Sequence, residues 1–293
     1  MLGVRCYQGD LSDYSAVKKA AEGCSIIFHV AAKAGVWGAY EEYYKTNVQG
    51  TENILRACRE LGIQRLIYTS SPSVTFDGKD QEGVDESTPY PAVYAAAYPA
   101  TKAAAERLIL TANGPDLATV ALRPHLIWGP GDQHLLPRLI ERARKGRLRL
   151  VDRGSKQVDA VYIDNAVTAH LCALERLKIG SPIAGKAYFI TNAEPWAMAD
   201  IINGMLQAVN IKPVRKSISF KFAYRLASCF EILYSFFRIQ REPPLTRFVT
   251  QQLATAHWYK TRAAREELGY IPRISMREGF GLLADAQRVP KKI

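Results

Sequence analysis

The first 124 residues alternate between short runs of β-branched or aromatic residues and longer segments with a helical pattern. Alternation of this kind is typical of βαβ units, in which parallel strands form a sheet that helices cover. The connections between such strands are right-handed. The sequence therefore predicts an α/β fold with a doubly wound parallel sheet. The strand-like runs are residues 25–30, 65–69 and 118–122, and the helical segments between them are residues 41–61, followed by Gly62 as a stop, and 92–113.

The alternation loosens in the rest of the chain. Gly129-Pro130-Gly131 marks a loop, and the remainder has the pattern of helices with a few short strands. We predict a sheet domain at residues 1–130 and a smaller, mostly helical substrate-binding lobe at residues 131–293, with a segment near residues 155–175 returning to the sheet. The 293 residues, 48% of them hydrophobic, are sufficient for a substantial core.

Charge and cysteine content narrow the classes of partner and compartment. The chain carries 39 Lys and Arg against 28 Asp and Glu, but its densest basic runs, residues 138–149 and 212–216, contain no pattern typical of nucleic-acid binding. We therefore expect no nucleic-acid partner. The five cysteines are widely separated without a Cys-x-x-Cys pair, and the first residues have no signal-peptide pattern. These features predict a reduced, cytoplasmic protein.

The residues that point most directly to chemistry are Tyr98 and Lys102, in the sequence Tyr-Pro-Ala-Thr-Lys. Side chains four residues apart on a helix are neighbours, so the ammonium can favour the phenolate and lower a pKa that is ordinarily about 10. A tyrosine tuned in this way can transfer protons near neutral pH. The spacing alone is weak evidence, because Tyr14 and Lys18 share it on what we expect to be a solvated helix face.

Strand-end hydroxyls distinguish Tyr98 from Tyr14. The strand at residues 65–69 is followed by Ser70, Ser71 and Ser73, which places these side chains at the carboxyl edge of the sheet. Ligands bind at that edge in open α/β folds. Any of the three serines is a candidate for the working hydroxyl on this ground alone.

Three features together resemble the extended short-chain dehydrogenases/reductases, which have a Rossmann-like fold. They are the strand-end serine, the Tyr-x-x-x-Lys helix and the run Leu-Arg-Pro-His-Leu-Ile-Trp-Gly-Pro-Gly-Asp at residues 122–132. Further segments resemble the 3β-hydroxysteroid dehydrogenase-like branch, especially its bacterial 2-alkyl-3-oxoalkanoate reductases, and the similarity runs over nearly the whole chain. These segments are residues 31–38, 68–71, 246–248 and 257–258.

The resemblance implies reversible hydride transfer between a nicotinamide and a secondary-alcohol carbon, with NAD or NADP as the cofactor and no metal ion. It implies that Ser71, three residues before Val74, hydrogen-bonds the substrate oxygen. Tyr98 would then move the proton, and Lys102 would lower the pKa of Tyr98 and hold the nicotinamide ribose. The residues that the resemblance places beside the cofactor are Asp10, Leu11, Val30, Ala31, Ala32, Lys33, Thr69, Ser70, Tyr98, Lys102, Pro124, His125 and Ile127.

Two of these assignments have structural alternatives. Asn47 corresponds to the helix asparagine near the active centre of the family, which we include among the catalytic residues. It can equally satisfy backbone groups in a kinked helix. His125 corresponds to the loop near the nicotinamide, and it can equally be a residue that only fills that loop.

The chain departs from the family at its beginning. Extended members start with a strand, a Gly-x-x-Gly-x-x-Gly turn and a helix whose N-terminus holds the pyrophosphate, whereas Gly9-Asp10 of this chain resembles the turn after the third strand. We therefore expect the first two βα units, about 50 residues, to be missing. The residue that selects NAD or NADP belongs to that part of the family's fold.

The most apolar segment, residues 218–237, has three alternative roles. It can line a pocket for a long alkyl or sterol substrate, or rest on a membrane surface with Lys216, Arg238 and Arg241 near the headgroups. Ordinary burial against the sheet is the third role. Charged residues interrupt the segment and argue against a membrane-spanning helix.

The sequence therefore predicts an NAD(P)-dependent oxidoreductase that interconverts a secondary alcohol and a ketone on a lipid-like substrate of the 3-oxo acid or 3β-hydroxysteroid type. A nucleotide-sugar epimerase or dehydratase of the same fold is one alternative, although dehydratases carry an Asp-Glu pair where this chain has Pro72-Ser73. A truncated, non-catalytic cofactor-binding paralogue is another. We also expect a homodimer through the helices at residues 41–61 and 92–113, and peripheral membrane contact through residues 216–241.

Overall fold

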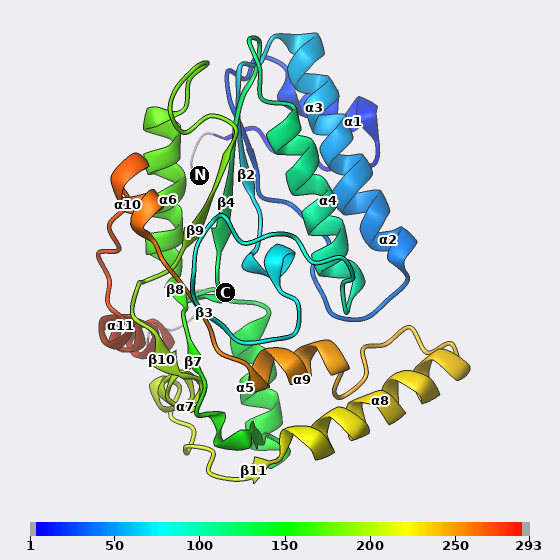
Figure 1. Cartoon of the computed structure of the whole chain (residues 1–293), viewed down its shortest axis with the longest axis vertical. Coiled ribbons are helices and arrows are strands. Elements are labelled where there is room, and N and C mark those ends of the chain that lie inside the picture. Colours follow the sequence, from blue (N-terminus) through cyan, green and yellow to red (C-terminus); the bar gives the residue numbers. More distant parts are fainter. Residues whose placement is uncertain (1–3, 289–293) are drawn as a thin grey trace.

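A parallel four-stranded sheet forms the centre of the computed structural model, which describes residues 4–288 (Figure 1). Every pairing in this sheet is parallel, and the strands lie in the order β1, β2, β4, β9. The predicted α/β fold with a parallel sheet is confirmed. The strands are β1 (Ile27–His29), β2 (Arg65–Thr69), β4 (Ala118–Pro124) and β9 (Lys186–Ile190).

Helices cover both faces of the central sheet (Figure 1). Side chains alternate along β2, so that Leu66 and Tyr68 pack with three helices on one face, whereas Ile67 packs with α6 on the other. Buried alanines of α6 bring this helix close to the strands. The helices of the first face are α1 (Tyr14–Ala21), α3 (Gly50–Leu61) and α4 (Ala97–Thr111), and those of the second are α6 (Ile163–Arg176) and α10 (Arg262–Glu267).

The helix predicted at residues 41–61 is continuous but changes its winding. It begins with α2 (Tyr40–Tyr44), continues through a π-helical turn at Lys45–Gln49 and ends with α3. Gly62 then adopts a left-handed conformation with φ of +68°, and its N–H donates to the carbonyl of Cys58, which confirms the predicted stop. Single π-helical turns often lie at functional sites, and this one contains Asn47.

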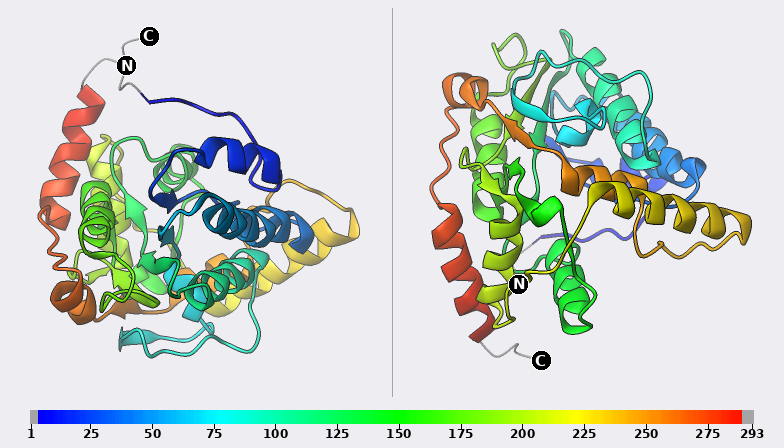
Figure 2. Two further views of the ribbon diagram at one scale, coloured as in Figure 1. Left: turned by 90° about the horizontal axis from the view of Figure 1, so that it is seen from above. Right: turned by 60° about the horizontal axis from the view of Figure 1, so that its bottom comes forward.

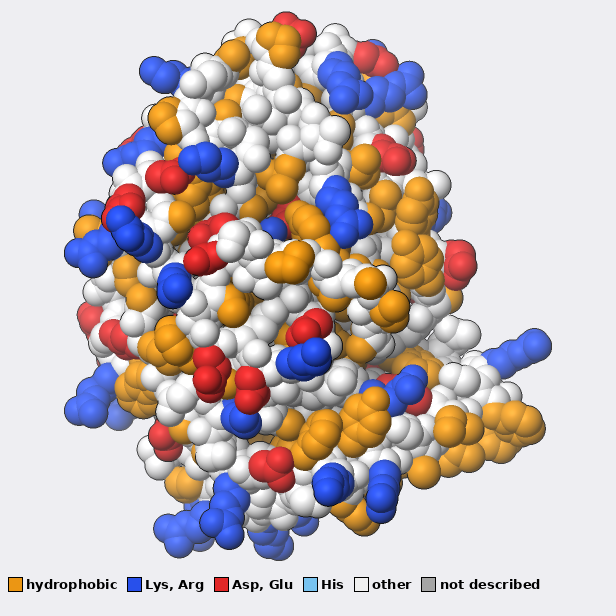
Figure 3. All heavy atoms as spheres, in the orientation of Figure 1, with side chains coloured by type: hydrophobic (Ala, Val, Ile, Leu, Met, Phe, Trp, Pro, Cys, Tyr) orange, Lys and Arg blue, Asp and Glu red, His pale blue; other side chains and the backbone are white. Residues whose placement is uncertain are grey.

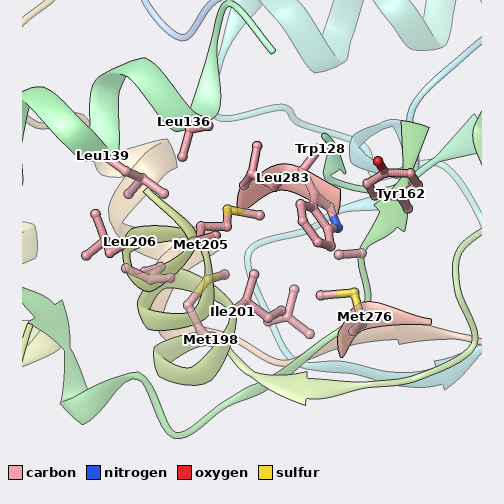
Figure 4. Packing of buried hydrophobic residues seen from close by; sticks show 14 of the residues in the cluster. Trp128, Leu136, Leu139, Tyr162, Met198, Ile201, Met205, Leu206, Met276 and Leu283 are labelled. Atoms are coloured by element: carbon pink, nitrogen blue, oxygen red, sulfur yellow. The ribbon is translucent and has the colours of Figure 1, made fainter. Parts of the chain in front are cut away.

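The C-terminal part of the chain surrounds a second hydrophobic core (Figure 4). In this core Trp128 and Tyr162 pack with buried side chains of α5, α7 and α11. Within residues 155–175, α6 packs against the central sheet, and the domain boundary near residue 130 stays a prediction. The helices here are α5 (Leu135–Arg144), α7 (Met198–Ala208), α8 (Phe220–Phe236), α9 (Arg247–Ala254) and α11 (Met276–Arg288).

Short strands complete this part of the molecule. One mixed sheet has the order β10, β7, β12, β3, and two further pairs, β11 with β6 and β5 with β8, are parallel. Their bounds are β3 (Gln81–Val84), β5 (Ile127–Trp128), β6 (Leu150–Val151), β7 (Gln157–Val158), β8 (Val161–Tyr162), β10 (Trp196–Ala197), β11 (Ser217–Ile218) and β12 (His257–Tyr259).

Helix α8 projects from the body of the molecule in two different views (Figures 1 and 2). Several of its large side chains are exposed, with 60% of Phe222 and 78% of Phe236 accessible to solvent. Ordinary burial of residues 218–237 against the sheet, one of the three predicted roles, is therefore wrong. Among residues 4–288, no helix is long and apolar enough to cross a membrane.

Candidate active site

The strand-end hydroxyl and the tyrosine come together at the carboxyl edge of the central sheet. Ser71 follows β2 and caps a 3-10 turn, with its Oγ accepting a hydrogen bond from the backbone N–H of Ser73 at 3.3 Å. Tyr98 lies in the first turn of α4, where Pro99 is tolerated because the first N–H groups of a helix have no helical partner. The Ser71 side chain lies near enough to the Tyr98 phenol to lower its pKa by hydrogen bonding.

The two alternative serines lie beside Ser71 in different settings. The Oγ of Ser73 lies 2.9 Å from the Oγ of Ser71, so these two hydroxyls form one hydrogen-bonded pair. The Oγ of Ser70 is buried and has no hydrogen-bond partner in this structure. The contact with Tyr98 supports Ser71 over its neighbours, and its role in the reaction stays a prediction.

Lys102 lies one turn further along α4 with its side chain only 2% exposed. Its Nζ donates a hydrogen bond to the backbone carbonyl of Thr69 at 2.6 Å and lies 4.1 Å from the centre of the Tyr68 ring. Burial lowers the pKa of Lys102 to about 7, and the negative charge of Glu106 opposes this shift only in part. An ammonium has three N–H donors, so two remain for a ligand.

The pKa of Tyr98 moves in the direction opposite to the one expected from the sequence. Burial raises it above its ordinary value, and the hydrogen bond with Ser71 lowers it by a smaller amount. Lys102 does not produce the expected net lowering, because its ammonium is directed at the Thr69 carbonyl and is itself desolvated. The phenol of Tyr98 is therefore protonated at neutral pH in this structure.

Asn47 connects the loop after β1 to the helix that carries Tyr98 and Lys102. Its Oδ1 accepts from the backbone N–H of Lys33 at 2.7 Å, and its Nδ2 donates to the Lys33 carbonyl at 3.1 Å and to Thr101 Oγ1 at 3.0 Å. These bonds bear out the alternative role of satisfying backbone groups. A contact between Asn47 and the reacting atoms stays a prediction.

The residues expected beside the cofactor after β1 form an accessible edge. Val30 is 59% exposed, Ala31 is exposed, and Ala32 and Lys33 are half-buried. Val30 therefore presents an exposed apolar side chain at the end of a strand, where a bound ligand can cover it. The Lys33 ammonium forms an ion pair with Glu42 at 2.6 Å.

The turn with Asp10 and Leu11, which is expected beside the cofactor, directly precedes α1. Asp10 is exposed, and its Oδ1 accepts hydrogen bonds from the backbone N–H and the hydroxyl of Ser12, both at 2.8 Å. Leu11 packs against α3 at Gly50, where an added Cβ would lie 2.8 Å from the Leu11 Cβ. Gly50 therefore permits the close approach of this turn to α3.

The loop after β4 joins the central sheet to the C-terminal part. Pro124 ends β4, and Ile127 in β5 is 39% exposed. His125 is buried, with its Nδ1 hydrogen-bonded to the Asp159 carbonyl and its ring 5.1 Å from the ring of His257. Burial, followed by the charge of His257, lowers the pKa of His125 to about 3. His125 is therefore neutral at physiological pH.

These residues fit the nicotinamide-ribose end of a dinucleotide. Lys102 offers free donors to ribose hydroxyls, the unpartnered Oγ of Ser70 can bond a ligand, and exposed Val30 can cover an apolar ring. All three lie at the carboxyl edge, where open α/β folds bind ligands.

Sequence reasoning missed several residues that support this cluster. His170 of α6 has its Nε2 2.7 Å from the Thr69 hydroxyl, and Thr101 receives the bond from Asn47. Glu106 lies one turn after Lys102, and its carboxylate binds buried Arg123. The spacing of Glu106 from Lys102 was a readable signal, whereas nothing in the sequence pairs residue 170 with residue 69.

Two adjoining cavities of about 130 and 340 Å³ lie between α5, α7 and α9. His125 and His257 line the smaller one, and Arg138, Arg142 and Glu242 line part of the larger one. Among the described residues, none from α8 lines either cavity, so the predicted role of residues 218–237 as a pocket wall is wrong for these cavities. The side chains shared by both are apolar and include Leu135, Leu139, Met198, Ile202, Val249 and Leu253.

The parallel sheet with Ser71, Tyr98 and Lys102 at its carboxyl edge defines the class of the extended short-chain dehydrogenases/reductases. The model of the 3-beta hydroxysteroid dehydrogenase/isomerase family matches residues 1–222. The chain is 52% identical to a 2-alkyl-3-oxoalkanoate reductase of Stenotrophomonas maltophilia over 96% of this chain and 86% of that protein. It is 46% identical to a 2-alkyl-3-oxoalkanoate reductase of Shewanella oneidensis over 95% and 74%. The protein therefore belongs to the 3-beta hydroxysteroid dehydrogenase/isomerase family.

A solved structure shares the fold at lower sequence similarity. The UDP-glucose 4-epimerase of Thermus thermophilus, solved in complex with NAD, superimposes with a TM-score of 0.73. It is 22% identical, and the match covers 99% of this chain and 86% of the epimerase. This likeness confirms the Rossmann-like class of the fold.

Proposed function

We propose that the protein is an NAD(P)-dependent oxidoreductase that interconverts a ketone and a secondary alcohol on a lipid-like substrate. The observation that carries this proposal is the cluster of Ser71, Tyr98 and Lys102 at the carboxyl edge of the sheet. Membership of the family and the similarity to two reductases of 2-alkyl-3-oxoalkanoates support it. The apolar lining of the cavities supports a substrate with a long hydrocarbon part.

Each residue of the cluster has a distinct task in this proposal. The nicotinamide, when bound, supplies or accepts the hydride. In the direction of reduction, Tyr98 donates its phenolic proton to the carbonyl oxygen, and the Ser71 hydroxyl donates a hydrogen bond to the same oxygen. Lys102 binds ribose hydroxyls, and its charge stabilises the phenolate that Tyr98 becomes. Asn47 holds the loop after β1 and α4 in register through Lys33 and Thr101.

The sharpest test exploits the two Tyr-x-x-x-Lys sequences of this chain. Tyr98→Phe removes the proton donor and should lower turnover of a long-chain 3-oxo acid by a factor on the order of 10² to 10⁴. Quenching of tryptophan fluorescence by NADH and NADPH should show that nucleotide binding is unchanged. The matched control is Tyr14→Phe, because Tyr14 lies on α1 beneath the Arg56 guanidinium, and Lys18 pairs with Glu60.

The outcomes separate this proposal from its alternatives. Equal loss of turnover in the Tyr98 and Tyr14 variants would show that the loss is not specific to the cluster of Ser71, Tyr98 and Lys102. Nucleotide binding without reduction of any ketone would favour a non-catalytic paralogue, and epimerisation of a nucleotide sugar would favour the second enzyme class. Binding of neither nucleotide would overturn the proposal itself.

The proposal extends to assembly and location. A homodimer through the helices at residues 41–61 and 92–113 rests on family-level expectation, and sedimentation of the purified protein tests it. A cytoplasmic location is supported by the five free cysteines. Peripheral membrane contact through residues 216–241 is supported by the exposed apolar side chains of α8.

A further inference from the structure

The outer face of α8 carries a continuous stripe of exposed apolar side chains. The stripe residues are spaced alternately four and three positions apart, which puts them on one face of the helix. Another face carries Ala223 and Ala227, which are buried where α8 packs on α9. Phe222 and Phe236 mark the two ends. The stripe consists of Phe222, Leu226, Cys229, Leu233 and Phe236.

This stripe has no function in the folding of the chain itself. The inner face of α8 already anchors the helix through its alanines, and Glu231 pairs with Arg247 of α9 and accepts the N–H of Arg247 at 2.7 Å. Further apolar side chains, Ile232 and Phe237, are exposed at 68% and 64%. Figure 3 shows hydrophobic side chains gathered along the projecting helix. Contiguous exposed apolar surface of this kind marks a binding site.

The charges around the stripe indicate what binds there. Residues 212–241 contain seven basic residues, all exposed, against one acidic residue, Glu231, which is already paired with Arg247. A second copy of the chain would bring the same cations to the interface, and like charges would oppose its binding. An anionic lipid surface matches both features, because it accepts apolar side chains and attracts the flanking cations. The seven are Lys212, Arg215, Lys216, Lys221, Arg225, Arg238 and Arg241.

The connection that follows α8 lines the larger cavity. The connection from α8 to α9 follows directly after the stripe, and its residues Glu242, Pro244 and Leu245 line that cavity. Arg138 of α5 holds this connection through two hydrogen bonds to Glu242, at 3.0 and 2.8 Å. The Trp37 indole donates to the Ile239 carbonyl at 3.1 Å. A surface that bound the stripe would therefore lie close to the connection that lines this cavity.

We propose that the outer face of α8 binds an anionic lipid bilayer and that the substrate enters the cavity between α5, α7 and α9 directly from that bilayer. The inference rests on the proposed function for the identity of the site. It adds the source of the substrate and the route by which it arrives. No covalent step is involved, because the stripe only places the cavity mouth at the lipid surface.

The first experiment measures binding to vesicles. The full chain should cosediment with vesicles of phosphatidylglycerol and phosphatidylcholine, less so as salt is raised, and weakly with phosphatidylcholine alone. The double variant Phe222→Ser, Phe236→Ser should weaken this binding at least about tenfold. The matched control is Val93→Ser, Ile271→Ser, which removes two exposed apolar side chains elsewhere, 82% and 57% accessible, and should bind as the wild type does.

Two other results of the same experiment would overturn the inference. One is equal vesicle binding by wild type and by the stripe variant. The other is an oligomer of the wild type that the stripe variant loses, without vesicle binding by either, since the occupant would then be a second copy. An unchanged melting temperature of the stripe variant verifies that it is folded, as expected for side chains that lie outside the core.

The second experiment separates this inference from the proposed function. The stripe variant should reduce a long-chain 3-oxo acid presented in anionic vesicles at least about tenfold more slowly than wild type, but reduce a short, water-soluble 3-oxo acid ester at the wild-type rate. If the stripe variant reduced both substrates at the wild-type rate, the proposed entry route would be overturned, whereas the proposed oxidoreductase function would stand. Failure of the wild type on both substrates would instead overturn the proposed function.

Discussion

Two buried cations, one on β4 and one on the adjoining helix α4, have different electrostatic partners. Arg123 of β4 is 3% exposed, and its guanidinium donates hydrogen bonds to the Glu106 carboxylate, with Nη2 and Oε1 2.6 Å apart. Lys102 of α4 is 2% exposed, and among residues 4–288 its ammonium contacts the Thr69 carbonyl and the Tyr68 ring but no carboxylate. Burial lowers the pKa of both groups. For Arg123 the hydrogen bonds and charge of Glu106 outweigh burial and raise the pKa, whereas the pKa of Lys102 falls to about 7.

The difference distinguishes a structural charge from a functional one. An unpaired charge in the interior costs several kcal/mol, so folds pair buried charges or do without them. Arg123 follows that rule, with Phe189 stacked 5.1 Å away as well. Lys102 is an exception to this rule, because it has no carboxylate partner. Its charge is instead available to the ribose hydroxyls of a ligand and to the phenolate that forms on Tyr98. A cation left without a carboxylate is thus itself a marker of the site.

The largest expected effect comes from breaking the structural pair. Glu106→Gln leaves the Arg123 guanidinium buried without its counterion and should destabilise the protein by about 3–5 kcal/mol. Chemical denaturation at pH 7 measures this loss. The same change made in an exposed pair, Glu266→Gln beside Arg262 at 2.8 Å, should cost less than about 1 kcal/mol. Similar losses in the two variants would contradict the view that Arg123 depends on its carboxylate.

The next effect concerns the functional cation. Lys102→Met keeps the volume of the side chain and removes a desolvated charge, so the variant should be inactive and yet at least as stable as wild type at pH 7. Between pH 7 and 10.5 the unfolded chain holds a proton on Lys102 that the folded protein has lost. Stability from this group therefore rises with pH across that window.

The measurement is the difference in unfolding free energy between wild type and Lys102→Met at two pH values. It should shift in favour of wild type by about 2–3 kcal/mol from pH 7 to pH 9. Subtraction of the variant removes other groups that titrate over this range. A difference independent of pH would show that Lys102 is hydrated in solution and would remove the contrast with Arg123.

Sequence reasoning reached the cluster but not the charges that frame it. Three of the four central strands, β1, β2 and β4, and the stop at Gly62 follow from local patterns, because apolar runs and a left-handed stop are properties of neighbouring residues. The fourth strand, β9, lies in the part of the chain where the alternation loosens, and it was not predicted. Tyr98 and Lys102 were readable from a local pattern, since four residues separate them. The environment of Lys102 depends on Thr69, which is distant along the chain. Its pKa depends on whether the lowering by burial or the raising by the charge of Glu106 is larger. Only packing decides that balance, and it reversed the expected direction for the pKa of Tyr98.

The same limit applies to α8. Its apolar residues were visible in the sequence as one segment, residues 218–237. Which side of that helix would meet the body depended on α9, more than ten residues further along the chain. Burial of Ala223 and Ala227 turned the aromatic side outward, where a hydrophobicity pattern by itself favours the core.

A third kind of buried titratable group completes the comparison, and it gives the smallest effect. His257 is 2% exposed, with its Nε2 2.7 Å from the Gln252 carbonyl. Burial lowers its pKa to about 4, so the protein keeps this side chain by leaving it neutral. Between pH 6.5 and 4 the unfolded chain binds a proton there that the folded protein does not, and stability from this group is lost as the pH falls through that window.

His257→Gln should therefore make unfolding less sensitive to acid. From pH 7 to pH 5 the variant should lose about 2 kcal/mol less stability than wild type, measured by denaturation at both values. His134→Gln, at an exposed position, should follow the wild-type curve. If the His257 and His134 variants lost stability equally with acid, burial would not keep His257 neutral. His257 would then not be an example of a buried titratable group that the fold keeps neutral, and the comparison would be limited to the paired Arg123 and the unpaired Lys102.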